Sequence, residues 1–203
     1  YDIDYYPERF RTGPGGTIDL DNLEFWEWLK DDYRQMLDRV SEADGLVLTF
    51  IETGAYAERQ FSKKMKSSEE KLAAVVNAIS DVLIGERKKK LYIRTFAYSE
   101  EEYKGTTGCI EYLKYDEVIL MMKETPHDFF LTHPDNYYIQ KMDRPVIVEF
   151  DLGNEYSGQG VVANTWPEHV MKRWNSYIHC PNVTGYVART DRYGNTSIVN
   201  TAN

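Results

Sequence analysis

Val118-Ile-Leu-Met-Met122, followed directly by Lys123-Glu-Thr-Pro-His-Asp128, is the stretch that decides the fold class. All five positions of the first segment are apolar, which is typical of a strand buried on both faces in a parallel sheet covered by helices. The same apolar character marks four further stretches, Gly45 to Phe50, Leu91 to Phe96, Val146 to Leu152 and Val183 to Ala188. We therefore predict five buried parallel strands.

Helical patterns lie between these strands. Asp21-Asn-Leu-Glu24 and Ser67-Ser-Glu-Glu70 resemble capping boxes, in which a side chain at each end satisfies a free backbone amide. A further helix is expected after Thr165-Trp-Pro-Glu168, and its buried stripe is predicted to be Val170, Trp174 and Ile178. Strands that alternate with helices indicate an α/β fold.

Two architectures fit this alternation of strands and helices: a doubly wound open sheet and a (β/α)8 barrel of the TIM type. A complete barrel needs eight strands and about 250 residues, so a barrel would be represented by about five strands from its C-terminal half. We expect residues 1–203 to form one domain of this partial barrel. Because the chain opens at Tyr1 without a methionine, we expect it to be a fragment of a longer protein.

The composition restricts the possible partners. With 24 Lys and Arg against 33 Asp and Glu, the net charge is −9, and a nucleic-acid surface would need a basic stripe. No stretch approaches the roughly 20 apolar residues of a membrane helix. Cys109 and Cys180 are too few for a disulfide framework. We therefore expect no nucleic-acid partner and no membrane partner, while the compartment and the oligomeric state stay open.

Polar side chains follow the predicted strands at the ends where parallel β/α folds place their reactive groups. They are Glu52, Arg94, Tyr98, Lys123, Asp128, Asp151, Glu155, Arg189, Asp191 and Arg192. Glycoside hydrolysis needs two carboxyl groups with separated pKa values, and Glu52, Asp128 and Glu155 are the candidates. Arg94 and Lys123 would suit a substrate that carries its own carboxylate.

Each candidate also has a structural interpretation. Glu52 and Glu155 could be solvated loop carboxylates, and Lys123 could be a surface lysine. Arg94 could form a structural ion pair, and Asp128 could close an Asx turn. Trp166 could stack on a ligand or pack at the start of its helix.

Residues 124–145 form a long connection without a clear helical pattern, which is typical of a functional loop. His127, His133 and Asp135 in this segment suggest a metal-assisted alternative. Their spacing matches no helix-borne metal motif, so we expect no metal and no cofactor.

Four motifs at the strand ends resemble the family 67 glycoside hydrolases, the α-glucuronidases that act on xylan oligosaccharides. They are Ile51-Glu52-Thr-Gly54, Ile93-Arg94-Thr-Phe96, Met122-Lys123-Glu-Thr-Pro-His-Asp128-Phe129 and Glu149-Phe-Asp151-Leu-Gly-Asn-Glu155-Tyr156. The likeness runs from about residue 16 to residue 198. The family has a lysine four residues before its acid glutamate, where this chain has Leu48.

The resemblance implies an inverting hydrolase that cleaves a uronic acid from a hemicellulose oligosaccharide. Glu52 would then be the general acid, and Asp128 or Glu155 the base. Arg94 and Lys123 would hold the sugar carboxylate, with Tyr156 and Trp166 as further substrate contacts. The alternative is a carbohydrate-binding or scaffold fragment of such an enzyme without catalysis.

Overall fold

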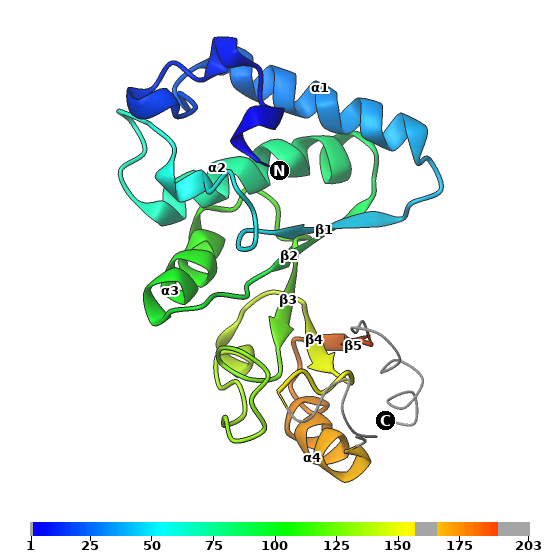
Figure 1. The fold of residues 1–203 in the computed structure, drawn as a ribbon. Helices are drawn as coiled ribbons and strands as arrows, with labels where there is room; N and C mark the ends of the chain where they lie inside the picture. Colours follow the sequence, from blue (N-terminus) through cyan, green and yellow to red (C-terminus); the bar gives the residue numbers. More distant parts are fainter. Residues whose placement is uncertain (1, 157–165, 191–203) are drawn as a thin grey trace. The chain divides into compact units, whose positions relative to one another are not determined.

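The computed structural model describes residues 2–156 and 166–190. The chain divides into two compact units, Tyr1–Val118 and Ile119–Asn203. Both units combine parallel strands with helices (Figure 1).

The first unit contains three α-helices and two strands between residues 2 and 118. In chain order they are α1 (Leu23–Arg39), β1 (Gly45–Thr49), α2 (Ser68–Ser80), β2 (Lys90–Arg94) and α3 (Glu100–Gly108). β1 and β2 pair in parallel, with Thr49 opposite Arg94 at their carboxyl ends. This register brings the residues that follow both strands to the same edge of the pair.

One of the two expected capping boxes is present. Ser67 accepts a hydrogen bond from the amide of Glu70, and the Glu70 carboxylate accepts one from the amide of Ser67, so α2 begins as predicted. In α1, Asn22 is the N-cap, and Asp21 instead accepts hydrogen bonds from the Ser62 hydroxyl and the Lys63 amide. The second box fails because these partners, some 40 residues away in the chain, engage the Asp21 carboxylate.

The core of the first unit lies between α2 and the strands. Val76 and Ile79 of α2 and Leu91 and Ile93 of β2 are at most 1% exposed. A second cluster packs α1 against the N-terminal segment and α2 through Phe10, Ile18, Leu20, Phe25, Leu29 and Ala78. Burial of these side chains drives the folding of this unit, at roughly 25 cal/mol per Å² of apolar surface.

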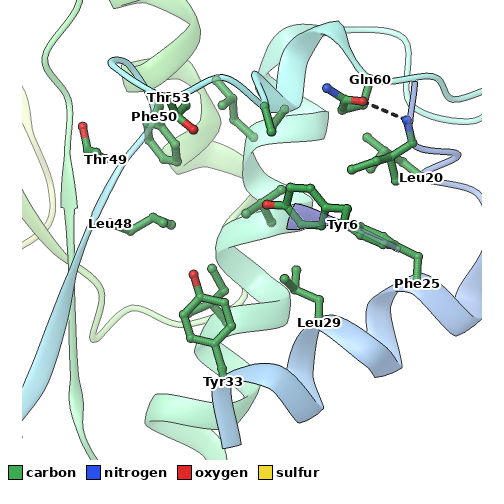
Figure 2. A pocket seen from close by; sticks show the side chains of 16 residues that line it. Tyr6, Leu20, Phe25, Leu29, Tyr33, Leu48, Thr49, Phe50, Thr53 and Gln60 are labelled. Carbon is green, nitrogen blue, oxygen red and sulfur yellow. Dashed lines mark hydrogen bonds between the residues drawn. The ribbon is translucent and has the colours of Figure 1, made fainter. Parts of the chain in front are cut away.

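A small cavity lies among α1, α2 and β1 (Figure 2). Its volume is about 80 Å³, and apolar side chains such as Leu29, Leu48 and Phe50 form much of its wall. Gln60 at its edge is bonded on both sides, since its oxygen accepts from the Ile18 amide and its nitrogen donates to the Tyr56 carbonyl. Organic ligands usually occupy pockets of roughly 300 to 1,000 Å³, so we interpret this space as a packing void.

The second unit contains three strands and one α-helix in its described part. They are β3 (Ile119–Lys123), β4 (Val146–Asp151), α4 (Pro167–Tyr177) and β5 (Val183–Arg189). β4 lies between β3 and β5, and both pairings are parallel. Lys123 is opposite Glu149, and Asp151 is opposite Arg189, so the carboxyl ends of all three strands lie at one edge. Leu120, Met122, Val146 and Val148 are fully buried.

The buried face of α4 differs from the prediction. Arg173 and Tyr177 are the buried residues of this helix, whereas Ile178 is 46% exposed. Val170 and Trp174 of the predicted stripe are half-buried, so the prediction was wrong for Ile178 and missed Arg173 and Tyr177. Hydrophobicity alone does not predict a buried arginine. Its charge is satisfied by polar groups from residues 124–138, which are described below.

The α/β class with five parallel strands is confirmed. The expected burial of all five strands was wrong for β1 and β5, where Val47 is 57% and Tyr186 is 65% exposed. The connection between β3 and β4 contains a 3-10 turn, Ile139–Lys141, and no α-helix, as predicted. None of the helices in residues 2–156 and 166–190 combines the length and apolar character required to cross a membrane.

Candidate functional site

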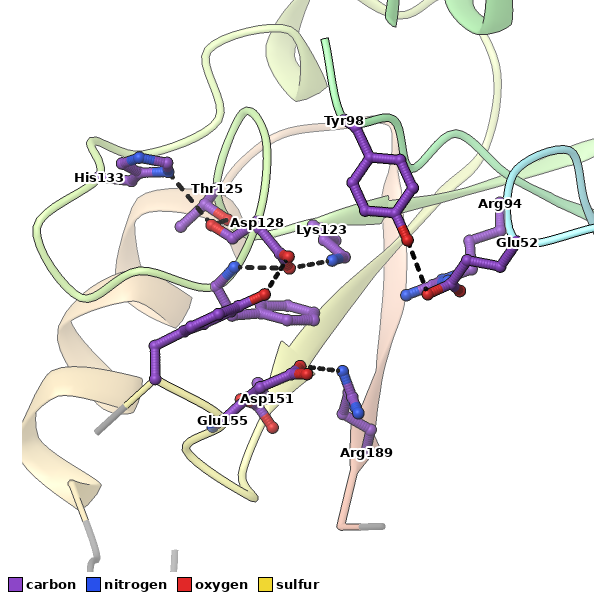
Figure 3. A network of polar contacts seen from close by, with 12 residues as sticks. Glu52, Arg94, Tyr98, Lys123, Thr125, Asp128, His133, Asp151, Glu155 and Arg189 are labelled. Carbon is purple, nitrogen blue, oxygen red and sulfur yellow. Dashed lines mark hydrogen bonds and ion pairs between the residues drawn. The ribbon is translucent and has the colours of Figure 1, made fainter. Parts of the chain in front are cut away.

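In the first unit, Glu52 contacts Arg94, the last residue of β2, and Tyr98, which follows that strand (Figure 3). Nη1 of Arg94 lies 3.4 Å from Oε2 of Glu52, and the Tyr98 hydroxyl lies 3.3 Å from Oε1. Both distances are at the long end for hydrogen bonds. The Arg94 guanidinium also lies 5.0 Å from the centre of the Phe96 ring, which fixes its orientation. The cluster therefore combines an exposed carboxylate with a partly buried cation.

The backbone of Glu52 is unusual. Its φ is 65°, in the left-handed region that residues with a Cβ rarely adopt. Such conformations cost about 1 to 3 kcal/mol and gather at functional sites. Glu52 follows β1 by three residues, so this backbone conformation sets the direction of a carboxylate side chain near the end of that strand.

In the second unit, Lys123 is the last residue of β3 and is only 4% exposed. Its ammonium donates to Oδ1 of Asp128 at 2.5 Å and lies 4.1 Å from the centre of the Phe129 ring. The amide of Phe129 donates to the same Oδ1 at 3.0 Å. The sequence-based interpretation of Lys123 as a surface lysine is therefore wrong.

Tyr156 completes this group by donating from its hydroxyl to Oδ2 of Asp128. The Tyr156 ring stacks on Phe130, with the two ring centres 4.0 Å apart. Asp128 therefore receives hydrogen bonds on both carboxylate oxygens, from a cation, an amide and a phenol. We call Lys123, Asp128 and Tyr156 the β3 trio.

The surroundings separate the pKa values of this trio. Burial raises the pKa of Asp128, but the hydrogen bonds from Lys123 and Tyr156 outweigh burial and leave the pKa below the ordinary 3.8. Burial, and then the hydrogen bond to Asp128, raise the pKa of the Tyr156 phenol far above its ordinary value. At neutral pH the trio thus holds an ionised carboxylate and a neutral phenol.

Glu155 and Arg189 form a second pair in this unit, with Nη1 of Arg189 2.7 Å from Oε2 of Glu155. Asp151 shapes the turn that carries Glu155, because its carboxylate accepts from the amides of Gly153 and Glu155. The guanidinium of Arg189 lies 5.8 Å from the centre of the Phe129 ring, which Lys123 also contacts. Two cations from β3 and β5 therefore meet the same ring.

The structure thus gathers the predicted site residues into local sets. Glu52 and Arg94 lie together in the first unit, while Lys123, Asp128 and Tyr156 lie together in the second unit. Glu155 belongs to the second unit and pairs with Arg189, and Trp166 is exposed at the N-cap of α4. The predicted strand-end residues Asp191 and Arg192 lie outside the described residues.

Three further residues of the second unit form a buried polar cluster that the sequence patterns did not predict. They are Glu124, Arg173 and Tyr177. Arg173 and Tyr177 are four residues apart on α4, and that spacing indicates a shared helix face. No pattern in the sequence marks that face as the buried one.

The metal alternative finds no support in the part of the chain that the structure describes, where no three His, Cys, Asp or Glu side chains are arranged to hold an ion. Nδ1 of His133 lies 3.2 Å from the carbonyl oxygen of Asp128, and Asp135 pairs with Arg173.

No family model and no curated protein matches the chain. Among solved structures, it is similar to N-acetylneuraminate lyase from Mycoplasma synoviae in two crystal forms, at 15% identity in both. The TM-scores are 0.49 and 0.47, over 86% and 82% of this chain. The chain spans 53% and 49% of those lyase chains, about half of their length.

These comparisons correct the expected family. The similar structures are lyases rather than glycoside hydrolases, and no family model supports membership of family 67. The predictions of a glycosidase, of xylan degradation and of a hemicellulose ligand are therefore wrong. At 15% identity and a TM-score below 0.5, the lyases' activity is not transferred to this chain.

Proposed function

We propose that the second unit binds a small organic anion at the carboxyl ends of β3, β4 and β5. We further propose that it catalyses proton transfer between Asp128 and this anion. Lys123 and Arg189 supply the positive charge for the anion, and the guanidinium can bind a carboxylate through two parallel hydrogen bonds. Asp128 is the base, and Tyr156 is the hydrogen-bond donor to the oxygen on which charge develops.

The burial of Lys123, the cation of the β3 trio, at a strand end is the observation that carries this proposal. An ion pair that is removed from water contributes little net stability, because desolvation of both charges offsets their attraction. Stability therefore does not account for a lysine that is 4% exposed. Ionisable groups with shifted pKa values at the carboxyl ends of parallel strands are candidates for function.

In the proposed site, binding of an anion to Lys123 changes the basicity of Asp128. In the structure, the bond from Lys123 lowers the pKa of Asp128 and makes it a weak base. An anion that binds Lys123 competes with Asp128 for the ammonium, so the carboxylate loses part of its stabilisation. The pKa of Asp128 then rises, and the base becomes stronger when a ligand is present.

The first unit supports a second candidate. We propose that Glu52 is a further proton-transfer group, which Arg94 and Tyr98 orient. Its left-handed backbone, three residues after β1, favours this role over that of a solvated loop carboxylate. Trp166 stays a predicted ligand contact.

We further propose that the fold is of the TIM-barrel type, with the five strands as the C-terminal part of an eight-stranded barrel. The alternation of parallel strands and helices supports this proposal. An experimental structure of a longer chain with fewer than eight barrel strands would contradict it.

The binding proposal can be tested with a panel of 2-oxo acids, 2-hydroxy acids and phosphate monoesters, by NMR titration of backbone amides. We expect at least one compound to shift signals near Lys123. Lys123→Met should weaken its binding about tenfold or more, since a hydrogen bond to a charged group contributes about 1.5 to 3 kcal/mol.

The chain offers a matched control. A second Lys–Asp–Tyr group consists of Lys114, Asp81 and Tyr115. Oδ1 of Asp81 accepts from the Lys114 ammonium at 2.6 Å and from the Tyr115 hydroxyl at 2.9 Å. Lys114 is 60% exposed and follows no strand. Lys114→Met should leave binding unchanged. Equal losses in the two variants, or no binding by any compound, would overturn the proposal.

Proton transfer is tested separately, by incorporation of solvent deuterium into the bound compound. Asp128→Asn should abolish the exchange, and Tyr156→Phe should slow it by a factor of 10² or more, in line with the usual contribution of a positioned acid or base. Exchange at the wild-type rate in Asp128→Asn would exclude Asp128 as the base.

A further inference from the structure

The face of α4 that is buried carries polar groups. Arg173 is 6% exposed and Tyr177 is fully buried, although both side chains have groups that need hydrogen-bond partners. A buried arginine is uncommon unless it is paired. The identity of its partners therefore indicates its role.

All three branches of the Arg173 guanidinium contact the segment 124–138, which carries Asp128. Nη1 donates to Oδ1 of Asp135 at 2.8 Å, and Nη2 donates to the carbonyl oxygen of His133. Nε lies 3.2 Å from Oε2 of Glu124, but its hydrogen bond goes to Nε2 of His169 on the same helix, at 3.4 Å. Arg173 thus contacts both ends of the loop that carries Asp128.

His133 connects this arginine to the β3 trio. Its Nδ1 lies 3.2 Å from the carbonyl oxygen of Asp128, and its amide donates to the carbonyl oxygen of Phe130 at 2.9 Å. The same Asp128 carbonyl accepts from the hydroxyl of Thr125 at 2.9 Å. The path from Arg173 to Asp128 therefore runs through a single residue.

Tyr177 closes the base of the same loop. Its hydroxyl donates to the carbonyl oxygen of Glu124 and accepts from the amide of Asn136 at 2.7 Å. The Asn136 side chain in turn donates to the carbonyl oxygen of Lys123 at 2.9 Å. Two residues of α4 thus hold both ends of the loop beside the last residue of β3.

We propose that Arg173 is a positioning residue of the β3 trio: it fixes the 124–138 loop on α4, through Glu124, His133 and Asp135, so that Asp128 meets Lys123 and Tyr156. Tyr177 supports it at the base of the loop. The importance of this placement rests on the proposed function, but the placement itself can be measured without a ligand.

The alternative is that Arg173 only stabilises the unit. A planar guanidinium that donates to Asp135 and to the His133 carbonyl, and lies beside Glu124, fixes the conformation of that loop. A general contribution to stability would not require these groups to belong to the segment with Asp128. The two roles differ in one measurable quantity, the pKa of Asp128, because its lowering depends on the hydrogen bonds from Lys123 and Tyr156.

The test is a ¹³C NMR titration of the Asp128 carboxyl group in the wild type and in folded variants. The double variant Arg173→Met, Glu124→Gln removes the cation without leaving Glu124 as an unpaired buried charge. We expect the pKa of Asp128 to rise toward 3.8 in this variant and to rise less in Arg173→Lys, which keeps the charge. Lys172→Met, on the exposed face of the same helix, is the control and should leave it unchanged.

Tyr177→Phe keeps the proposal testable if the arginine variants fail to fold. It removes one hydroxyl and should raise the pKa of Asp128, as the double variant does. An Asp128 pKa equal to that of the wild type in every folded variant would overturn the positioning role. Absence of ligand binding by the wild type would contradict the proposed function alone, since this titration contains no ligand.

Discussion

The substitution Glu124→Gln is expected to change how the stability of the protein depends on pH. Glu124 is 7% exposed. Burial raises its pKa from 4.5 to about 7, and the charges of Asp135 and Asp151 act in the same direction, whereas Arg173 lowers it. The difference between these two pKa values corresponds to ~3 kcal/mol, since one pKa unit is worth about 1.4 kcal/mol.

The sign follows from the number of bound protons. Between pH 4.5 and about 7, the folded state keeps the proton on Glu124, while the unfolded state has released it. The free energy of unfolding therefore contains a contribution that is complete below pH 4.5 and is lost as the pH rises through about 7. Glutamine carries no ionisable proton, so the variant lacks this dependence.

Urea unfolding at a series of pH values from 4.5 to 8 measures the effect. Relative to the wild type, Glu124→Gln should gain ~3 kcal/mol of unfolding free energy across this range. Glu117→Gln, at an exposed position, serves as the control and should follow the wild type. Parallel curves for the wild type and Glu124→Gln would refute the assignment of a raised pKa to this buried carboxyl group.

Three further outcomes are expected. Leu120→Ala should reduce the free energy of unfolding by about 3 kcal/mol in chemical denaturation, because Leu120 is fully buried in β3; Val47→Ala, at a position 57% exposed, should change it far less. Ser67→Ala should cost about 1 kcal/mol by removing the capping box of α2, and a loss below 0.3 kcal/mol would count against that role. Tyr156→Phe should raise the pKa of Asp128 in a ¹³C titration, and no rise would show that the phenol does not stabilise the carboxylate.

The strands could be predicted because their determinants are local. Leu120 and Met122 are buried along an uninterrupted apolar run, and the structure begins and ends β3 within one residue of the expected bounds. The box at Ser67 is local too, since both of its hydrogen bonds join residues three apart. Asp21 shows the limit of this reasoning, because partners distant in the chain engage its carboxylate.

Side-chain partners in the candidate site could be predicted only in part. The strand-end rule brought Lys123 and Asp128 forward because both follow an apolar run, and the structure pairs them. The burial of Arg173 could not be predicted, since its partners belong to a loop without a regular pattern. The family expectation failed for a related reason, because short motifs around Glu52 and Glu155 fix local spacing and not the chemistry that the whole site performs.

The two Lys–Asp–Tyr groups of this chain show what distinguishes a candidate site from a surface ion pair. Both groups place an ammonium and a phenol on one aspartate, and in both the pKa of that aspartate is lowered. Around Asp81 the lysine is mostly exposed, so water can replace each hydrogen bond at little cost. Around Asp128 the lysine is buried at the end of β3, so an incoming anion could gain an interaction that water does not already provide. The two groups therefore contain the same residue types, and only their positions in the fold distinguish the candidate site around Asp128 from the surface ion pair around Asp81.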